Sequence, residues 1–472
     1  MLGENHKENV LLLRQRLRCE QNFDLIERHL HVGGVDLCFF YIDGFVKDGE
    51  MQRVMQTLMT MKESGTAEYV AARLPYVEVD LSSDVSEIVC GVLSGQSCVI
   101  GETFGPSAIL VDTRTYPART TAEPDTDRVM QGARDGFVET LVMNTALIRR
   151  RIRDPRLTMR HFDLGGSSHT DVVMCYMEGV ADERTVETIA KKLSSLKPDT
   201  MTLGYQSLAE SLINKGWLNP FPKVRLTERP DTASSQVLEG SILLISDTTP
   251  QVMILPTSIF AFIQQTDDFY FPPLTGTYLR LVRTVILLLS VVLTPLWYLY
   301  LEYADMLPDF LRFLIPKSPG ALPIILQLLL VEVALDGLKI ASMNTPDMLS
   351  NSLSVVGALL LGDFATEVGW LSADVILYMA FIAIANFAQQ NIELGYAFKF
   401  MRVATLLFVY FFGVWGLLLG LLLFVFLVVT NTTVTGGRHY LYPLVPFDKE
   451  ALLRLIFRFK KRENEIKTKR NP

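Results

Sequence analysis

The feature that most constrains this chain is an abrupt change in composition near Arg280. Roughly 280 residues of mixed polar sequence come first, and Leu281–Leu301 then reads LVRTVILLLSVVLTPLWYLYL, with Arg283 as its one charged residue. As a helix, this stretch is long enough to cross a bilayer core of about 30 Å. Met1–Glu20 carries charge throughout and lacks the apolar core of a signal peptide. The sequence therefore predicts a large cytoplasmic domain followed by a membrane domain.

Five apolar segments are candidates for membrane helices. They are Leu281–Leu301, Ala321–Ala341, Leu353–Phe364, Trp370–Phe387 and Val403–Val429. The third is too short to span, because about a dozen residues make a helix of about 18 Å. We therefore predict an all-α polytopic membrane domain with about four full crossings and one short helix that is re-entrant or buried.

Basic residues predict the orientation of this domain. Arg280 and Arg283 stand at the start of the first span, and the residues after Gly437 are strongly basic. Because cytoplasmic flanks are enriched in Lys and Arg, we expect a multi-pass membrane protein with both termini in the cytoplasm. This arrangement would place Lys399 and Arg402 on the outer side.

The soluble part contains an internal duplication. Cys38–Glu50 reads CFFYIDGFVKDGE and matches VMCYMEGVADERT at Val173–Thr185, and Val92–Thr113 matches Val237–Thr257 in the same order. In each case β-rich runs flank polar turns. The sequence therefore predicts two similar α/β subdomains joined by a linker at Thr113–Asp127.

The predicted organisation has five parts. Residues 1–30 form an N-terminal helical segment, 31–130 the first α/β subdomain, 131–275 the second, 276–430 the transmembrane domain and 431–472 a basic amphipathic cytoplasmic tail.

The soluble part lacks the common signatures of catalysis. There is no GxGxxG, P-loop, nucleophile elbow or HExxH motif, so we predict that the protein is not an enzyme and uses no cofactor. The 5 cysteines contain no CxxC pair and are interpreted as reduced and structural.

Two other motifs receive structural interpretations. His29 and His31 have an alternate spacing seen in metal sites, but we identify no acidic or cysteine partner for them, so we predict no metal site. The basic run Arg149–Arg151 with Arg153 is interpreted as compensating a helix dipole and pairing with acidic neighbours, and we expect no nucleic-acid partner.

Acidic residues in the membrane domain are the candidate site. The group consists of Glu332, Asp336, Asp363, Glu367 and Asp374. Carboxylates facing lipid are costly, so we expect these groups to face protein or water, and a path lined by them would favour cations. The alternative is that some lie at the interface or pair with a nearby lysine.

The last apolar segment and the tail carry two further signals. Gly413, Gly416 and Gly420 include a GxxxG spacing, which predicts close helix packing. The tail segment Ala451–Phe459 is amphipathic, and we predict that it lies at the membrane interface or, alternatively, binds a partner. The interface residues are Arg454, Arg458, Lys460 and Lys461.

Several stretches resemble one family. Gly132–Leu157, Asn219–Asp231 (NPFPKVRLTERPD) and Val237–Thr257 resemble the A subunits of the GerA spore germinant receptors, and Gly362–Phe387 is closer to one branch of that family. The resemblance covers nearly the whole chain.

The resemblance implies a location and a function. It implies the inner membrane of a bacterial spore and an oligomeric ion channel that releases monovalent cations during germination. The implied partners are membrane lipid, further copies of the chain in a homo-oligomer, and other spore germination or stage V sporulation membrane proteins. A secondary transporter, or a scaffold that does not conduct ions, remains open as an alternative.

Overall fold

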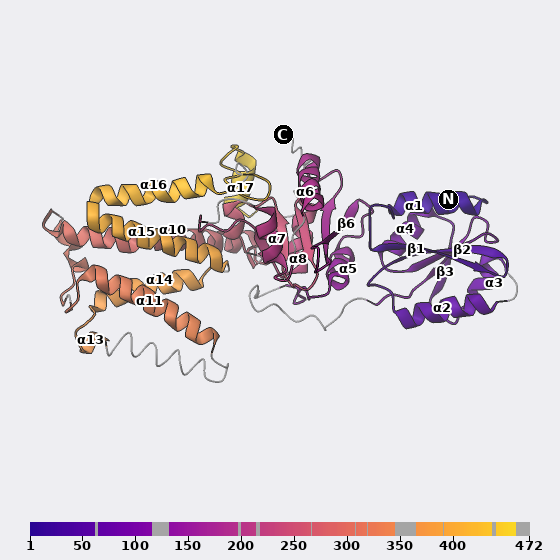
Figure 1. Cartoon of the computed structure of the whole chain (residues 1–472), viewed down its shortest axis with the longest axis horizontal. Helices are drawn as coiled ribbons and strands as arrows, with labels where there is room; N and C mark the ends of the chain where they lie inside the picture. The colour runs from indigo at the N-terminus through magenta and orange to yellow at the C-terminus, as the bar shows by residue number, and fades with distance from the viewer. Residues whose placement is uncertain are drawn as a thin grey trace.

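The computed structural model shows an elongated molecule with its helical region at one end and the N-terminal sheet at the other (Figure 1). It describes the whole 472-residue chain except residues 62–64, 116–131, 197–199, 214–217, 345–364, 437–439 and 459–472, and positions 266, 307, 319 and 390. The predicted short segment Leu353–Phe364 and most of the predicted linker lie outside the described residues.

The first subdomain is an antiparallel sheet between two layers of helices. The strand order is β1-β2-β4-β5-β3. Its elements are α1 (His6–Leu17), β1 (Leu25–Val32), β2 (Val35–Ile42), α2 (Asp48–Thr60), α3 (Ala67–Ala71), β3 (Val79–Ser82), α4 (Val85–Leu93), β4 (Ser97–Gly101) and β5 (Ala108–Val111).

The second subdomain repeats this plan element by element. The strand order is β6-β7-β9-β10-β8, which is the first order with each strand number raised by five. Its elements are α5 (Leu141–Arg151), β6 (Leu157–Leu164), β7 (Thr170–Met177), α6 (Glu183–Ser195), α7 (Tyr205–Leu212), β8 (Arg225–Thr227), α8 (Pro230–Leu238), β9 (Ile242–Ser246) and β10 (Val252–Leu255). The structure therefore confirms a duplicated α/β domain.

Each sheet is covered by two pairs of helices because both of its faces are apolar. All five residues of the central strand β4 are buried, as expected for a strand with helices on both sides. α1 and α4 cover one face and α2 and α3 the other (Figure 1). In the second subdomain α5 and α8 lie opposite α6 and α7.

The structure differs from the predicted division at residues 30 and 31. β1 begins at Leu25, and Leu13 and Leu17 of α1 are fully buried in the core of the first subdomain. α1 therefore belongs to the first repeat, as α5 belongs to the second, and is not a separate N-terminal segment.

A buried ion pair joins the two subdomains. Arg149 of α5 donates hydrogen bonds from Nε and Nη2 to the two carboxylate oxygens of Asp24, both at 2.9 Å, and a third from Nη2 to Asn22 at 3.3 Å. All three residues are at most 1% exposed. Arg151 of the same run pairs with Asp135 at 2.6 Å. The expectation that this basic run pairs with acidic neighbours is confirmed for these two residues.

The helical region follows the second sheet through η1 (Ile259–Phe262) and α9 (Asp267–Tyr270). Its further elements are α10 (Pro273–Glu302), η2 (Ala304–Met306), η3 (Asp309–Leu314), α11 (Ile324–Met343), α13 (Ala365–Glu367), α14 (Ala373–Phe387), α15 (Ile392–Phe412), α16 (Val414–Thr430) and α17 (Lys449–Ile456).

Two helices among the described residues, α10 and α15, are long and apolar enough to cross a membrane. The prediction of four full crossings is therefore wrong for the described residues, which contain two candidate spans. α14 has 15 residues and α16 has 17, which give about 22 Å and about 26 Å against a bilayer core of about 30 Å. α11 is long enough but carries Glu332, Asp336 and Lys339 within one apolar stretch.

The predicted span Val403–Val429 is two helices rather than one long helix. The chain turns at Gly413, whose φ is +56°, and α16 then packs back against α15. A left-handed backbone such as this favours glycine.

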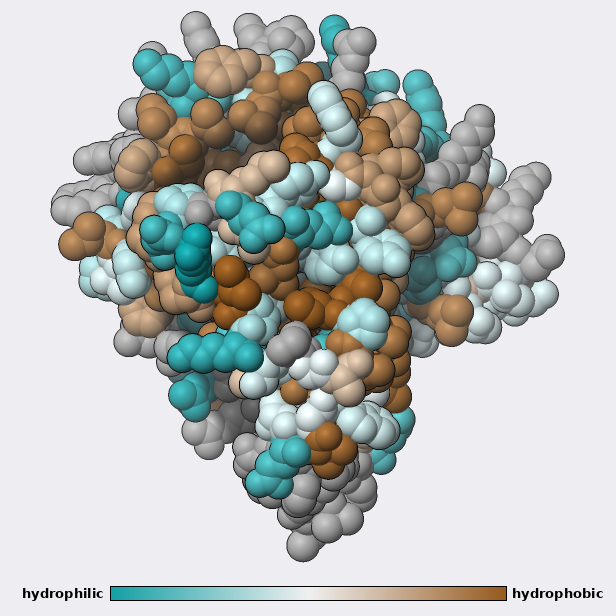
Figure 2. All heavy atoms as spheres, turned by 90° about the vertical axis from the view of Figure 1, so that its left-hand side faces the viewer, coloured by the Kyte–Doolittle hydropathy of each residue, from teal (hydrophilic) through white to brown (hydrophobic). Residues whose placement is uncertain are grey.

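Much of the surface of the helical region is apolar. Large hydrophobic side chains on α10, α11, α14, α15 and α16 are more than half exposed, among them Leu288, Val333, Leu377, Phe411 and Leu422. Figure 2 looks onto the far end of this region and shows apolar groups across much of the face, with hydrophilic groups between them. Apolar surface of this extent indicates contact with lipid or with a protein partner.

Candidate functional site in the helical region

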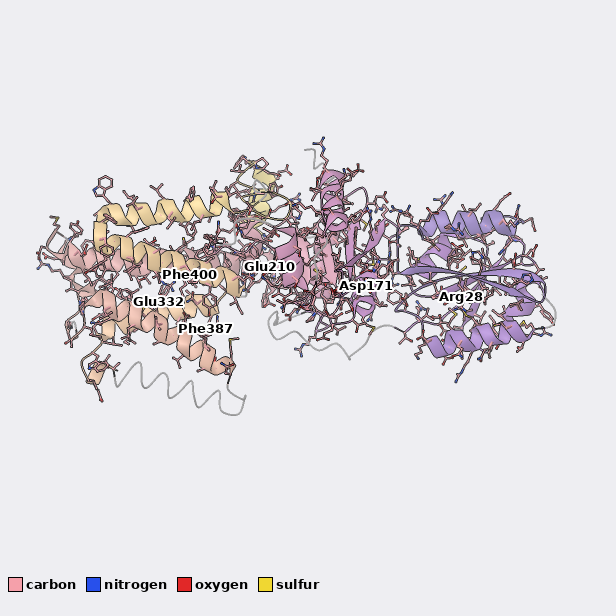
Figure 3. The ribbon with its side chains drawn as sticks, in the orientation of Figure 1. Arg28, Asp171, Glu210, Glu332, Phe387 and Phe400 are labelled. Atoms are coloured by element: carbon pink, nitrogen blue, oxygen red, sulfur yellow. The ribbon has the colours of Figure 1, made fainter. Side chains whose placement is uncertain are left out.

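The candidate site is a buried network of charges between α11 and α15. Nε of Arg402 donates to Oε1 of Glu332 at 2.6 Å, and Nζ of Lys399 lies 3.5 Å from Oε2 of the same carboxylate. Lys399 also pairs with Asp336. Figure 3 shows Glu332 in the interior of the helical region.

The network arises from helical spacing on both sides. Glu332 and Asp336 are four residues apart in α11, whereas Lys399 and Arg402 are three apart in α15, so each pair lies along one helix face. Nη1 of Arg402 also donates to the carbonyl oxygen of Ser290 in α10 at 3.1 Å, which brings a third helix into the site.

Because the network is buried, breaking its ion pairs has a large cost in stability. Arg402 is 1% exposed and Glu332 is 5% exposed, whereas the Asp336 side chain is 37% exposed. Nη2 of Arg402 is buried without a hydrogen-bond partner in the described part of the chain. Removing one member of a buried ion pair leaves an uncompensated charge, which costs several kcal/mol.

The network bears on two expectations from the sequence. Lys399 and Arg402, which the four-crossing arrangement would place toward the outer side, lie inside the bundle and face α11. Within one chain, Glu332 is therefore a neutralised carboxylate and does not offer a bare negative charge to a cation path. The i, i+3 spacing of the two basic residues, which places them on one helix face, is the signal in the sequence for a shared partner.

The remaining predicted carboxylates lie apart from this network. Glu367 in α13 is exposed, and Asp374 in the first turn of α14 is partly exposed. Neither makes an ion pair with another side chain that the structure describes. Asp363 lies outside the described residues.

The predicted packing glycines lie where two helices of the same chain pack together. A Cβ at Gly416 would overlap the carbonyl oxygen of Phe408, and one at Gly420 would overlap the side chain of Thr405. Both neighbours belong to α15. The GxxxG spacing therefore lets the two helices of the Gly413 turn approach closely.

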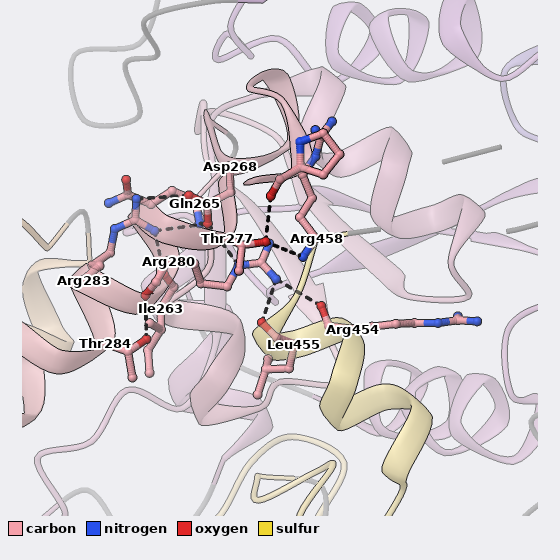
Figure 4. Close-up of polar contacts among 11 residues, drawn as sticks. Ile263, Gln265, Asp268, Thr277, Arg280, Arg283, Thr284, Arg454, Leu455 and Arg458 are labelled. Atoms are coloured by element: carbon pink, nitrogen blue, oxygen red, sulfur yellow. Dashed lines mark hydrogen bonds and ion pairs between the residues drawn. The ribbon is translucent and has the colours of Figure 1, made fainter. Parts of the chain in front are cut away.

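A second cluster of charges lies where α10 meets the soluble domain (Figure 4). The fully buried Asp268 lies within 3.4 Å of both Arg280 and Arg283. Nη1 of Arg280 donates to the carbonyl oxygens of Arg454 and Leu455, at 3.1 and 2.7 Å. The first turns of α10 are thus joined to the end of the tail helix α17.

The predicted interface residues of the tail divide into three groups. Arg454 is exposed, as expected for a membrane-interface residue. Arg458 instead donates to the carbonyl oxygens of Phe269 and Phe271, which ties it to the segment before α10. Lys460 and Lys461 lie outside the described residues.

The stretch Asn219–Lys223 joins the soluble domain to the last two long helices. Asn219 donates to the carbonyl oxygen of Leu427 in α16 at 2.6 Å, and Nζ of Lys223 donates to Oδ1 of Asn431 at 2.6 Å. Burial lowers the pKa of the Lys223 ammonium.

Phe221 of this stretch supplies the apolar part of the contact. Its ring, 1% exposed, packs edge-on against Phe398 of α15 and Phe424 of α16, with ring centroids 6.2 and 5.5 Å away. In the sequence, this stretch stands out only by its resemblance to one protein family. Its role in the contact could not be predicted from spacing, because its partners lie about 200 residues later.

The cysteines are free thiols in the structure. Burial raises the pKa of both Cys98 and Cys175 to about 12, so these thiols are protonated and unreactive at neutral pH.

Comparison with known proteins finds similar sequences over nearly the whole chain. Residues 12–470 match the model of the Bacillus/Clostridium GerA spore germination protein family. Stage V sporulation protein AF of Bacillus subtilis is 35% identical over 96% of this chain and 92% of its own length.

More distant relatives are spore germination proteins of the same organism. Spore germination protein KA is 27% identical over 92% of this chain and 81% of its own, and spore germination protein A1 is 24% identical over 98% and 97%. A solved structure, the N-terminal domain of the A subunit of the Bacillus megaterium spore germinant receptor GerK3, is 24% identical, covers 54% of this chain and 95% of its own, and has a TM-score of 0.41. The chain therefore belongs to the GerA family of spore germination proteins.

Proposed function

We propose that this protein is a membrane subunit of a spore germination complex and that several copies of it form a path for monovalent cations in the inner membrane of the spore. The observation that carries the proposal is the group of four ionisable side chains among the apolar helices. Ionisable residues at membrane depth are costly and are characteristic of ion pathways. The names of the relatives indicate the process, which is germination. The conduction of ions is proposed from the charged side chains.

The exposed apolar surface supports assembly into a homo-oligomer. The two candidate spans among the described residues are too few to enclose a pore, whereas a ring of copies places one path on its symmetry axis. Exposed side chains on α14 and α16, such as Leu377 and Leu422, then contact lipid or the neighbouring copy.

Within such a ring, Asp336 is the residue best placed to meet a cation. It forms the partly exposed edge of the network, and its partner Lys399 already places a monovalent positive charge against it. A passing cation would compete with this ammonium for the same carboxylate. Glu332 acts behind Asp336 by holding Lys399 and Arg402 in position.

The soluble domain and the tail support one orientation. Ser258, directly after the second sheet, donates to the carbonyl oxygen of Tyr442 at 2.5 Å, and Ile259 N donates to Tyr440 O at 2.9 Å. The segment that enters the helical region therefore contacts the segment that leaves it, which supports placing the soluble domain and the tail on the same, cytoplasmic side.

The contact at Asn219–Lys223 supports a regulatory role for the soluble domain. A shift of the second subdomain would move the ends of α15 and α16 through Phe221. We propose that a signal received by the soluble domain changes the position of these helices. We propose no catalytic step for the chain.

A secondary transporter is the second candidate. The observation that favours it is the interruption of the helices at Gly413 and between Phe387 and Ile392, since broken helices form substrate sites in many transporters. A scaffold that does not conduct ions is the third.

Reconstitution into liposomes separates these functions. The protein in a KCl gradient should release K⁺ at a rate that does not saturate at transporter-like turnover, and the detergent-solubilised protein should have the mass of several copies. Flux that saturates at low turnover would favour the transporter. A monomeric protein that shows no K⁺ flux would favour the scaffold.

A further inference from the structure

The outer edge of the first sheet brings together three side chains of metal-ligating types. β1 and β2 pair in the register His29↔Cys38, so the imidazole and the thiol lie on one face of the sheet. Glu27 lies two residues before His29 in β1 and therefore points to the same face. Nε2 of His29 is 2.8 Å from Oε1 of Glu27 and 4.0 Å from Sγ of Cys38.

We propose that Glu27, His29 and Cys38 form a binding site for a divalent metal ion of the zinc class. One ligand atom from each residue lies within 4.8 Å of the others. The acidic ligand, Glu27, lies two residues before His29 in the same strand, and the strand register supplies the cysteine ligand, Cys38.

The distances suit a tetrahedral ion after small movements. With zinc bonds of about 2.3 Å to sulfur and about 2.1 Å to nitrogen, tetrahedral angles place the two ligand atoms about 3.6 Å apart. The observed separation of Sγ and Nε2 is 4.0 Å. The His29 side chain is 56% exposed, so an ion can enter from solvent and keep a water as its fourth ligand.

Arg14 of α1 holds the carboxylate in place. Its Nε and Nη2 donate to the two oxygens of Glu27 at 2.7 and 2.5 Å. Each carboxylate oxygen has a second lone pair, and Oε1 also contacts His29. Hydrogen bonds to a ligating carboxylate are a regular feature of metal sites, and they orient the ligand.

The ligand types decide the class of metal. One thiolate, one imidazole and one carboxylate favour Zn²⁺ or a similar transition ion, whereas Mg²⁺ and Ca²⁺ require oxygen ligands. A bound ion would cross-link the edge strand β1 to β2 and would stabilise the first subdomain.

The second repeat contains a natural counterpart that lacks this site. His161 in β6 corresponds to His29, but Met159 takes the place of Glu27, and Val173, opposite His161, takes the place of Cys38. His161 instead pairs with Asp171 at 2.7 Å. The chain therefore offers a matched control at the same position of the same fold.

Titration of the purified full-length chain with Co²⁺ tests the site. Co²⁺ replaces zinc in such sites and gives a near-ultraviolet absorption band when a thiolate binds it. We expect one equivalent of Co²⁺ to produce this band, and excess Zn²⁺ to remove it. Cys38→Ser should abolish the band, and His29→Ala should weaken the affinity at least about tenfold.

Control variants make the result specific. Cys98→Ser removes another buried thiol of the same sheet, and His161→Ala removes the counterpart histidine, so both should retain the band and the affinity. His29 is exposed, and its variant gives a readout even if Cys38→Ser does not fold. The proposal is overturned if no thiolate band forms, if His29→Ala binds Co²⁺ as tightly as the parent protein, or if Cys98→Ser loses the band.

Discussion

Arg402 in α15 and Glu332 in α11 form a buried ion pair with 2.6 Å between Nε and Oε1. The two residues are 70 positions apart in the sequence, and together with Lys399 they join α11 to α15. The pair makes Glu332 a positioning residue of the bundle, and it leaves Asp336 as the accessible carboxylate of the network.

Removing the charge of Glu332 should destabilise the helical region. Glu332→Gln leaves Arg402 buried without its counter-ion, and we expect a loss of about 3–5 kcal/mol in the free energy of unfolding. Thermal unfolding of the detergent-solubilised chain provides the measurement.

A double variant separates pairing from packing. Glu332→Gln combined with Arg402→Gln removes both charges and should recover part of the lost stability, because no unpaired charge remains. If the double variant is less stable than the two single losses added together, the pair is not the source of the effect.

The ion pair between Asp24 and Arg149 should be worth far more than a surface pair. Arg149→Met leaves the buried Asp24 unpaired and should lower the stability of the contact between the subdomains by about 3–5 kcal/mol. Arg156→Met is the control, since its pair with Asp154 is on the surface and should cost less than about 1 kcal/mol.

Hydrogen exchange of peptides from β1 and β6 reports this difference directly. Exchange should accelerate strongly in Arg149→Met and hardly change in Arg156→Met. Equal acceleration in both variants would show that burial does not set the strength of the Asp24 pair.

Phe221→Ala should loosen the contact between the soluble domain and the helices. Truncating a buried phenylalanine costs about 3–5 kcal/mol, and here the cost falls on the contact with Phe398 and Phe424. Hydrogen exchange should increase in residues 427–436. Phe310→Ala, at a side chain that is 74% exposed, should leave exchange there unchanged.

Asp231 should make the second subdomain sensitive to acid. Burial alone would raise the pKa of its carboxyl, but hydrogen bonds from Arg229 and Tyr270 outweigh burial and hold the pKa below its ordinary value of 3.8. A depressed pKa contributes stability above about pH 4, and this stability is lost as the pH falls through the folded-state pKa.

The matching variant is Asp231→Asn. It should be less stable than the parent at pH 7, and the difference should shrink as the pH falls below about 4. A difference in unfolding temperature that stays constant from pH 7 to pH 3 would contradict this account.

The sequence predicted what depends on local pattern. The duplicated strands, the turns at Gly44 and Gly179, both with positive φ, and the first long span were all visible as repeats or apolar runs. The repeat also includes α1, which the predicted division left out: residues 9–18 (NVLLLRQRLR) match residues 144–153 (NTALIRRRIR) at five of ten positions. Both helices cover the same face of their sheets.

The rest depends on contacts between distant residues. The turn at Gly413 interrupts an apolar run that continues on both sides, so hydropathy alone reads it as one helix. The partners of Glu332 and of Cys38 are set by helix packing and by strand register, and neither follows from spacing along the chain.

Single-channel recording of the reconstituted full-length protein in a KCl gradient tests the central proposal most directly. We predict unitary currents whose reversal potential lies near that of K⁺, and we predict that Asp336→Asn shifts the reversal potential toward zero. Asp305→Asn, which changes an exposed carboxylate outside the network, should leave it unchanged. The absence of unitary currents from a protein that is correctly assembled, or an identical reversal potential in Asp336→Asn, would contradict a cation path at this site.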